Sequence, residues 1–228
     1  MSLATEFARA RAIAWKDLTA ERRTKANFNA VLFFTALILL LFGFALGPDQ
    51  DALRGAAAGV LWLTVLFGGV LSFNRSYEME LEGGALEALL LYPGDRRALF
   101  AGKLMANLAF LVLIEAILVP LAAILYDLPL LVPNGGFLGV LLLGTIGFVT
   151  LGTFYAAMAS RVRAREVLLP LLLFPMLVPL LLSSVEATKA LLAGNLMGDA
   201  SSWIRLLAVF DVIFVVASFF AFEYVIEE

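Results

Sequence analysis

The sequence contains no cysteine and no histidine among its 228 residues, and few of its residues are charged. Without cysteine, the chain cannot form a disulfide, a thiolate metal site or a cysteine nucleophile. Without histidine, it lacks the usual ligand of zinc and copper, the usual axial ligand of haem iron, and the side chain that titrates near neutral pH. Several common catalytic and metal-binding chemistries are therefore excluded before any motif is considered.

Charged residues make up 15% of the chain, hydrophobic residues 62%, and the mean hydropathy is +0.97. Soluble domains contain about 25% charged residues, so these values are typical of a chain whose main solvent is lipid. Six apolar runs each approach the roughly 20 residues that cross a bilayer as a helix. They cover residues 27–46, 52–73, 104–126, 137–160, 167–185 and 203–224. The sequence predicts one all-α integral membrane domain of six transmembrane helices over residues 1–228.

Residues 1–26 precede the first apolar run and show a different pattern. Phe7, Ala10, Ala14 and Leu18 recur at helical spacing, and basic residues occupy the rest of the helical wheel. This pattern predicts an amphipathic helix that lies on the membrane surface. Charged residues interrupt the segment, so we expect it to be retained rather than cleaved as a signal peptide.

The distribution of basic residues predicts the orientation in the membrane. Six crossings put both termini on one side. If that side is the cytoplasm, 13 of the 16 Lys and Arg residues lie inside, and only Arg54, Lys189 and Arg205 lie outside. The positive-inside rule therefore predicts cytoplasmic termini.

The longest polar interval between two apolar runs, residues 74–103, falls on the same side. The pair Gly83-Gly84 opens a short helix-compatible run, and Pro93 closes it because proline cannot continue a helix. Asp95 is positioned to cap a new helix that leads into the next apolar run. We expect a short surface helix here.

A resemblance to a known family rests on this interval. The motif Gly-x-Leu-Glu-x-Leu-x-Leu-x-Pro in the first cytoplasmic loop, after an amphipathic helix and within six spans, resembles the ABC-2 class of ABC-transporter permeases. It comprises Gly84, Leu86, Glu87, Leu89, Leu91 and Pro93. Within that class the chain resembles the CcmB family, the membrane subunit of the haem-export module of cytochrome c maturation. The likeness covers nearly the whole length.

The resemblance implies partners and a division of labour. Residues 74–103 would be a coupling segment whose motif helix docks on a CcmA-like ATPase subunit, although surface helices also occur without any partner. ATP and magnesium would be bound by that subunit, and two permease copies would form a homodimer above a two-fold ATPase. Further partners would be a CcmC-like haem-handling membrane protein, a small CcmD-like subunit and a CcmE-like haem chaperone. The setting would be the bacterial cytoplasmic membrane, with no role for nucleic acid.

The residues agree that this chain is not itself an enzyme. The nearest candidate for a phosphate-binding loop, Gly94 with Gly102-Lys103-Leu104, has the wrong spacing and no Ser or Thr for magnesium. We also predict that the chain binds no haem, because His and Cys are absent. The haem propionates call for Lys or Arg, whereas the membrane interior offers acids.

Those acids are Glu115 in the third run and Asp211 in the sixth. A charged residue at the bilayer centre costs roughly 2.5 to 3.5 kcal/mol, so each needs a reason to be there. One alternative is a role in translocation or a conformational switch, and the other is a protonated acid bonded to a neighbouring helix. Arg161, Arg163 and Arg165 form a cytoplasmic basic rim. Their simplest role is to determine the membrane topology, and the alternative is contact with an acidic ATPase surface or with anionic lipid headgroups.

Small-residue pairs suggest where helices approach closely. Gly55-x-x-x-Gly59 and Gly135-x-x-x-Gly139 predict close helix packing. After the fifth apolar run, residues 186–193 are long enough for a short helix on the outer face, which Gly194-Asn195 ends. In ABC-2 permeases the corresponding outer segment often re-enters the membrane, and a plain surface loop is the alternative.

Two other functions stay open at this point. An ABC-2 exporter of a lipid, a polysaccharide or a drug would share the motif, although such exporters usually have a longer first outer loop. A secondary transporter or a membrane scaffold would not require the motif at all.

Overall fold

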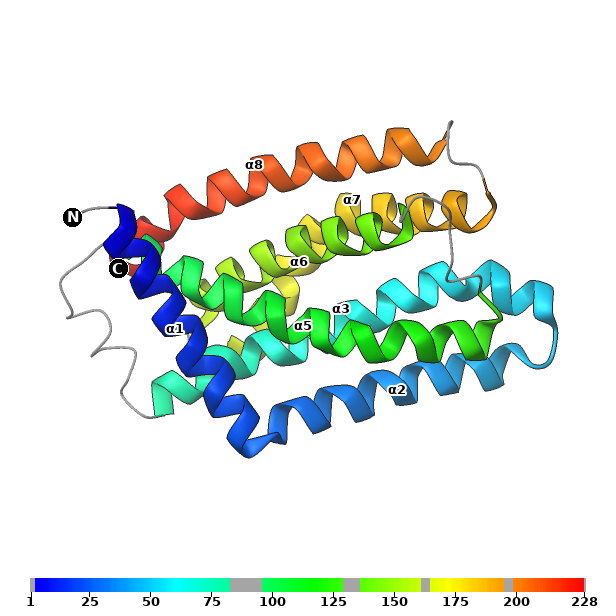
Figure 1. Ribbon diagram of the computed structural model, residues 1–228, viewed down its shortest axis with the longest axis horizontal. Helices are drawn as coiled ribbons and strands as arrows, with labels where there is room; N and C mark the ends of the chain where they lie inside the picture. The colour runs from blue at the N-terminus through cyan, green and yellow to red at the C-terminus, as the bar shows by residue number, and fades with distance from the viewer. Residues whose placement is uncertain (1–2, 83–95, 129–135, 161–164, 195–198, 228) are drawn as a thin grey trace.

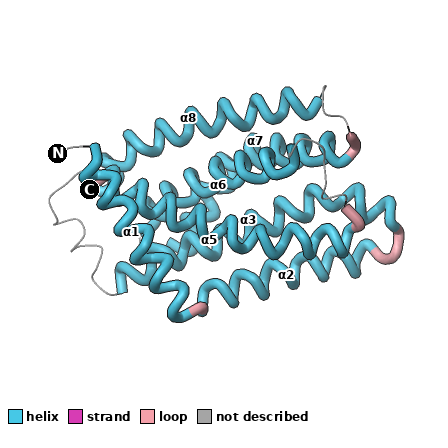
Figure 2. Tube along the Cα trace, in the orientation of Figure 1, coloured by secondary structure: helices cyan, strands magenta, loops and turns pink. Residues whose placement is uncertain are grey.

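The computed structural model describes residues 3–82, 96–128, 136–160, 165–194 and 199–227, and within these ranges the regular structure is α-helical (Figure 2). The helices are α1 (Leu3–Thr24), α2 (Ala26–Leu46), α3 (Gln50–Glu82), α5 (Arg97–Tyr126), α6 (Gly136–Ser160), α7 (Arg165–Leu192) and α8 (Asp199–Glu227). Six of them, α2 to α8, are long and apolar enough to cross a membrane. This finding confirms the predicted number and order of spans.

The six long helices run up and down as one bundle, and the two ends of the described chain lie at the same end of it (Figure 1). We call this end the terminal end, and the other the distal end. The first contains the end of α3 and the start of α5, and the second contains the turn between α2 and α3. An even number of crossings requires this arrangement.

Helix α6 is the most central of the later spans and packs against α3, α5, α7 and α8. Two thirds of its apolar window (67%) is buried, against 17% for the windows of α2 and α8, which face outward. Glycines in α6 allow side chains of α3 to approach its backbone closely. A Cβ at Gly144 would lie 2.2 Å from Trp62 Cη2, and one at Gly152 would lie 2.0 Å from Phe73 Cε2. Two large aromatic rings of α3 therefore fill notches in α6.

The prediction of close packing at Gly55-x-x-x-Gly59 is wrong within this chain, because no atom of the described residues lies within 4 Å of a Cβ added at either glycine. Gly139 likewise has no such neighbour among the described residues, but Gly135 lies outside them, so that pair stays a prediction. Residue spacing predicts a small-residue face, but helix rotation decides whether that face meets another helix. In α3 the close contact is instead made by Gly69, whose Cβ would lie 2.2 Å from Phe148 Cε1.

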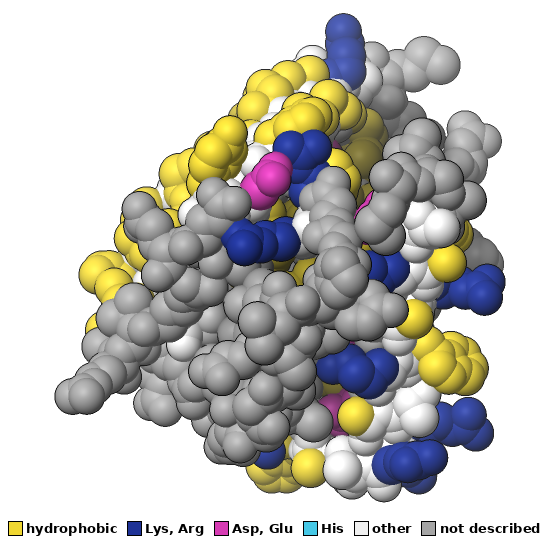
Figure 3. Space-filling model, turned by 90° about the vertical axis from the view of Figure 1, so that its left-hand side faces the viewer, with side chains coloured by type: hydrophobic (Ala, Val, Ile, Leu, Met, Phe, Trp, Pro, Cys, Tyr) yellow, Lys and Arg dark blue, Asp and Glu magenta, His cyan; other side chains and the backbone are white. Residues whose placement is uncertain are grey.

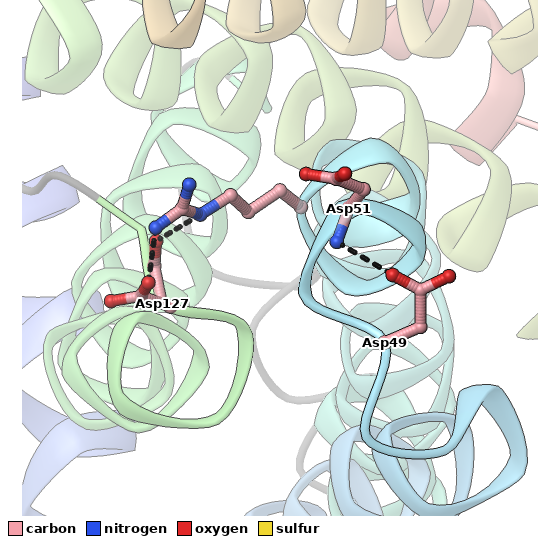
Figure 4. Close-up of polar contacts among 4 residues, drawn as sticks. Asp49, Asp51 and Asp127 are labelled. Carbon is pink, nitrogen blue, oxygen red and sulfur yellow. Dashed lines mark hydrogen bonds and ion pairs between the residues drawn. The ribbon is translucent and has the colours of Figure 1, made fainter.

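A short turn connects α2 to α3 at the distal end. Gly47 follows α2 at φ 74°, a conformation that favours glycine. Asp49 Oδ1 then accepts a hydrogen bond from the Asp51 amide at 3.0 Å, so it caps the start of α3 (Figure 4). The Arg54 guanidinium pairs with the carboxylate of Asp127 (Figure 4). Asp127 follows the last residue of α5 and has a left-handed backbone conformation with φ 50°. This pair joins the start of α3 to the end of α5.

Two helices extend beyond their predicted apolar runs. Helix α3 continues past residue 73 to Glu82. Its last turns are polar because the helix extends beyond the apolar run. Residues 186–192 are helical as predicted, but they continue α7 instead of forming a separate helix. Gly194, with φ 78°, follows that end.

Helix α1 crosses the bundle at a steep angle, at the terminal end (Figure 1). Ala10, Ile13 and Ala14 are buried on its inner face. A Cβ at Gly102 of α5 would lie 2.7 Å from Ala10 O and 2.7 Å from Ile13 Cβ, so the two helices are in direct contact. Phe7, by contrast, is 63% exposed. The predicted N-terminal helix is confirmed, with part of its apolar face packed on α5.

Candidate functional site

The residues predicted to couple the chain to an ATPase lie outside the described residues. They are Gly84, Leu86, Glu87, Leu89, Leu91 and Pro93. Arg161 and Arg163 of the basic rim also lie outside them, and Arg165 is the first residue of α7. Their roles stay predictions. The structure does describe the bases of the coupling segment, which are the last turns of α3 and the first turns of α5.

A buried lysine joins these two bases to α1. The Lys103 side chain is 1% exposed, and its Nζ lies 3.0 Å from Asp17 Oδ2 of α1. The same Nζ donates a hydrogen bond to Ser76 O of α3 at 2.9 Å and lies 5.1 Å from the centre of the Tyr77 ring. A buried cation is stable only with such partners. Lys103 therefore fixes α1, α3 and α5 relative to one another; we call this group the Lys103 junction.

Asp17 is shared between two lysines, since Lys16 Nζ lies 2.9 Å from its Oδ1. Beside this pair, α1, α3 and α5 enclose a cavity of about 190 Å³, which Arg75 and Asn107 also line. Asn107 is buried and donates to Thr153 Oγ1 of α6 at 2.9 Å. Asn107 thus connects the wall of this cavity to the central helix α6.

Glu115, the first of the two intramembrane acids, contacts α6. It is 1% exposed, and its Oε1 lies 2.7 Å from Thr145 Oγ1. Thr145 Oγ1 is also 2.7 Å from Leu141 O. A hydroxyl has one proton and donates only one hydrogen bond, so both contacts are satisfied when a protonated Glu115 donates to Thr145 and Thr145 donates to Leu141. Glu115 Oε2 has no hydrogen-bond partner within the described ranges.

Asp211, the second acid, contacts the same helix from α8. It is 5% exposed, and both carboxyl oxygens are buried without a hydrogen-bond partner in the part of the chain that the structure describes. Its Oδ1 would lie 2.2 Å from a Cβ at Gly147, so the carboxyl fills the notch that this glycine leaves. Leu180 of α7 closes the same notch.

The structure brings both acids to α6 but not to each other. Thr145 and Gly147 are two residues apart, so they point about 200° apart around the helix. Glu115 and Asp211 accordingly hold α6 from opposite sides. Glu115 is hydrogen-bonded to a neighbouring helix, and its protonation state and its role stay predictions. Neither contact tests a role in translocation.

Basic side chains are spread over the terminal end, as Figure 3 shows. Arg97, in the first turn of α5, pairs with Glu223 of α8 at 2.8 Å, and its guanidinium lies 4.9 Å from the centre of the Phe220 ring. The start of α5 is therefore joined to α8 as well as to α1 and α3.

Sequence reasoning missed the Lys103 junction. In the sequence, Lys103 is the last residue of the polar interval 74–103, and its partner Asp17 is far away. The only available signal was a lysine next to Gly102 at the start of an apolar run, which does not identify a partner on α1.

Comparison with known proteins identifies the family. A family model described as CcmB protein matches residues 8–228 of the chain. The chain belongs to the CcmB family. Curated relatives named heme exporter protein B agree with this CcmB assignment. The protein of Rhodobacter capsulatus is 34% identical over 180 residues, 78% of this chain and 82% of the relative.

Two further relatives with the same name match similar lengths. The protein of Paracoccus denitrificans is 30% identical over 187 residues, covering 81% of this chain and 84% of the relative. That of Pseudomonas aeruginosa is 31% identical over 174 residues, covering 76% and 77%. The predicted family is thus confirmed over most of the chain.

Membership of the CcmB family confirms the predicted function at the level of the complex. The chain is a multi-pass membrane component of the cytochrome c maturation ABC exporter. It is a non-catalytic transporter subunit, and its family implies an ABC ATPase partner. In the described residues, no group of three or more acidic side chains is placed to hold a metal ion. The prediction that ATP, magnesium and haem are bound by partner subunits stays a prediction.

Proposed function

We propose that the terminal end of the bundle faces the bacterial cytoplasm and carries the surface on which the CcmA-like ATPase docks. The observation that carries this proposal is the basic residue distribution, with 13 of 16 Lys and Arg residues in segments assigned to this end. Positive residues in short loops determine which side of a membrane protein stays in the cytoplasm. The N- and C-termini are accordingly cytoplasmic.

Cysteine labelling tests this orientation, because the chain has no cysteine of its own. Thr24 and Gln50 are both exposed and lie at opposite ends of the bundle. Thr24→Cys should react with a membrane-impermeant maleimide only after the cells are opened, and Gln50→Cys should react in intact spheroplasts. The reverse pattern would overturn the orientation, and labelling of both from one side would overturn the six-span topology.

The coupling step is proposed to use the motif from Gly84 to Pro93. Helix α3 extends beyond its apolar window to Glu82, and α5 begins at Arg97, so two helices of the bundle flank the motif. The Lys103 junction supports this proposal because it fixes both helices to α1. A displacement of the motif by the ATPase would thereby move α1, α3 and α5 together.

A charge reversal at Glu87 tests the coupling surface. Glu87→Arg should weaken co-purification of the ATPase and reduce its stimulated hydrolysis, while membrane insertion stays normal. The matched control is Glu186→Arg, the same change on α7 at the distal end, where Glu186 pairs with the exposed Lys189. Equal ATPase recovery with both variants would contradict the coupling role.

For the cargo, we propose that a companion subunit, CcmC-like, holds haem, and that this chain converts ATP hydrolysis into release of a haem-loaded CcmE-like chaperone. Two copies of this chain and a small CcmD-like subunit would complete the complex. The absence of His and Cys supports this proposal, since both are common haem ligands. Addition of haem to the purified chain should give no saturable axial-ligand spectrum. A one-to-one spectrum lost on mutation of a single Met or Tyr would make the chain a haem conduit.

A further inference from the structure

A groove lies where α1 turns into α2, against the outer side of α5. Leu18, Phe28, Ala109, Phe110 and Leu113 form its apolar part, Glu21, Arg22, Lys25 and Asn29 form the rest, and its volume is about 490 Å³. The Phe28 and Phe110 rings meet edge to face, with centroids 6.3 Å apart. The groove is therefore a structured hollow between three helices.

The groove is amphipathic along the membrane normal. Leu113 lies ten residues after Lys103 on α5, about 15 Å along the helix towards the middle of the bilayer, and it is 54% exposed. Arg22 and Lys25 lie at the other end, where α1 crosses the bundle. The apolar part thus faces acyl chains and the basic part lies at the level of headgroups.

The charges of the groove favour an anion. Arg22 and Lys25 are exposed, and neither side chain forms an ion pair or hydrogen bond with the described part of the chain. Among the described residues of the lining, Glu21 is the one acid, and its Oε1 accepts a hydrogen bond from the Phe28 amide at 2.7 Å. The two cations and this carboxylate leave a net charge of +1, which favours one ligand that is apolar at one end and negative at the other.

We propose that this groove is a binding site for one anionic phospholipid. One acyl chain lies along Phe110 and Leu113, and the headgroup phosphate meets Arg22 and Lys25. The proposal goes beyond the transport function and does not depend on the orientation of the chain. Each basic residue near a membrane surface favours an anionic lipid, and together the two residues give roughly a 30-fold preference.

The test compares two lipids with the same acyl chains. The full chain in detergent is titrated with dioleoyl phosphatidylglycerol or dioleoyl phosphatidylcholine, and bound lipid is followed by native mass spectrometry and by the unfolding temperature. Phosphatidylglycerol should bind roughly 30-fold more tightly and raise the unfolding temperature at saturation. Equal affinity for the two lipids would overturn the proposal.

Variants locate the binding to this groove. Arg22→Gln/Lys25→Gln should abolish the preference for phosphatidylglycerol. Phosphatidylcholine binding should weaken far less, because its choline group offsets the charge of the phosphate. The control Arg11→Gln/Arg23→Gln removes two exposed charges of α1 that do not line the groove, and it should keep the preference. If both double variants lose the preference equally, the preference comes from the overall positive charge of α1 and not from the groove, and the proposed site is refuted.

Two further arms separate a lipid from other occupants. Glycerophosphoglycerol, the headgroup without acyl chains, should not compete at concentrations where the lipid saturates; competition would mean an anion site that does not use the groove. Leu113→Asn changes an exposed side chain and should weaken both lipids. Unchanged lipid binding in that variant would also overturn the proposal.

Discussion

Removing the charge of Lys103 or of Asp17 should destabilise the folded chain, because it breaks the ion pair between α1 and α5. Lys103 Nζ and Asp17 Oδ2 are 3.0 Å apart, with the lysine 1% and the aspartate 18% exposed. At an effective dielectric constant of about 20, two unit charges at this distance attract by roughly 5.5 kcal/mol. Desolvation of the buried lysine opposes this attraction. We expect a net coupling of about 2 to 3 kcal/mol.

A double-mutant cycle measures this coupling. Asp17→Asn and Lys103→Met each keep the approximate shape of the side chain and remove its charge. Each single change should cost about 2 to 3 kcal/mol of unfolding free energy, and the double change should cost scarcely more than either single one. Unfolding by sodium dodecyl sulfate in mixed micelles, followed by circular dichroism, gives the free energies.

An exposed ion pair in the same chain is the control. Lys189 and Glu186 lie 2.8 Å apart on α7, with side chains 48% and 34% exposed, and their coupling should be about 0.5 kcal/mol or less. A Lys103–Asp17 coupling as small as that of this pair would contradict a stabilising buried ion pair. Strict additivity would mean that α1 is held on α5 by apolar packing alone.

Two further predictions concern the contacts of α6. Gly147→Ala and Gly152→Ala should each cost about 1 to 3 kcal/mol in the same unfolding assay, because the added methyl groups overlap neighbouring side chains, whereas Gly139→Ala should be nearly neutral. If each carboxyl is protonated, Glu115→Gln and Asp211→Asn should stay within about 1 kcal/mol of the native chain, because an amide then replaces a neutral group of similar shape. A loss above about 3 kcal/mol in either amide variant would indicate an ionised carboxylate with a partner.

The six spans could be predicted from the sequence because bilayer thickness sets the length of an apolar helix. Their polar extensions could not, since hydropathy locates the membrane and not the end of a helix. Helix α3 therefore continues from its apolar run to Glu82, and α7 to Leu192. The family motif was recognisable as a local pattern of Gly, Leu, Glu and Pro.

Partners across the bundle could not be predicted in the same way. Glu115 and Asp211 were correctly placed within spans, but their contacts with Thr145 and Gly147 depend on how each helix is rotated about its axis. The Lys103 junction likewise needs the position of α1, which no local pattern contains.

The enclosed position of α6 has a consequence for biosynthesis. Helix α8 leaves the ribosome after α6, and it brings the Asp211 carboxyl into a notch at Gly147 that exists only once α6 is in place. Hydrocarbon disfavours a carboxyl group, so a nascent chain whose α6 is missing or mispaired presents Asp211 to lipid. Correct pairing of α8 with α6 therefore removes one polar group from the lipid-facing surface.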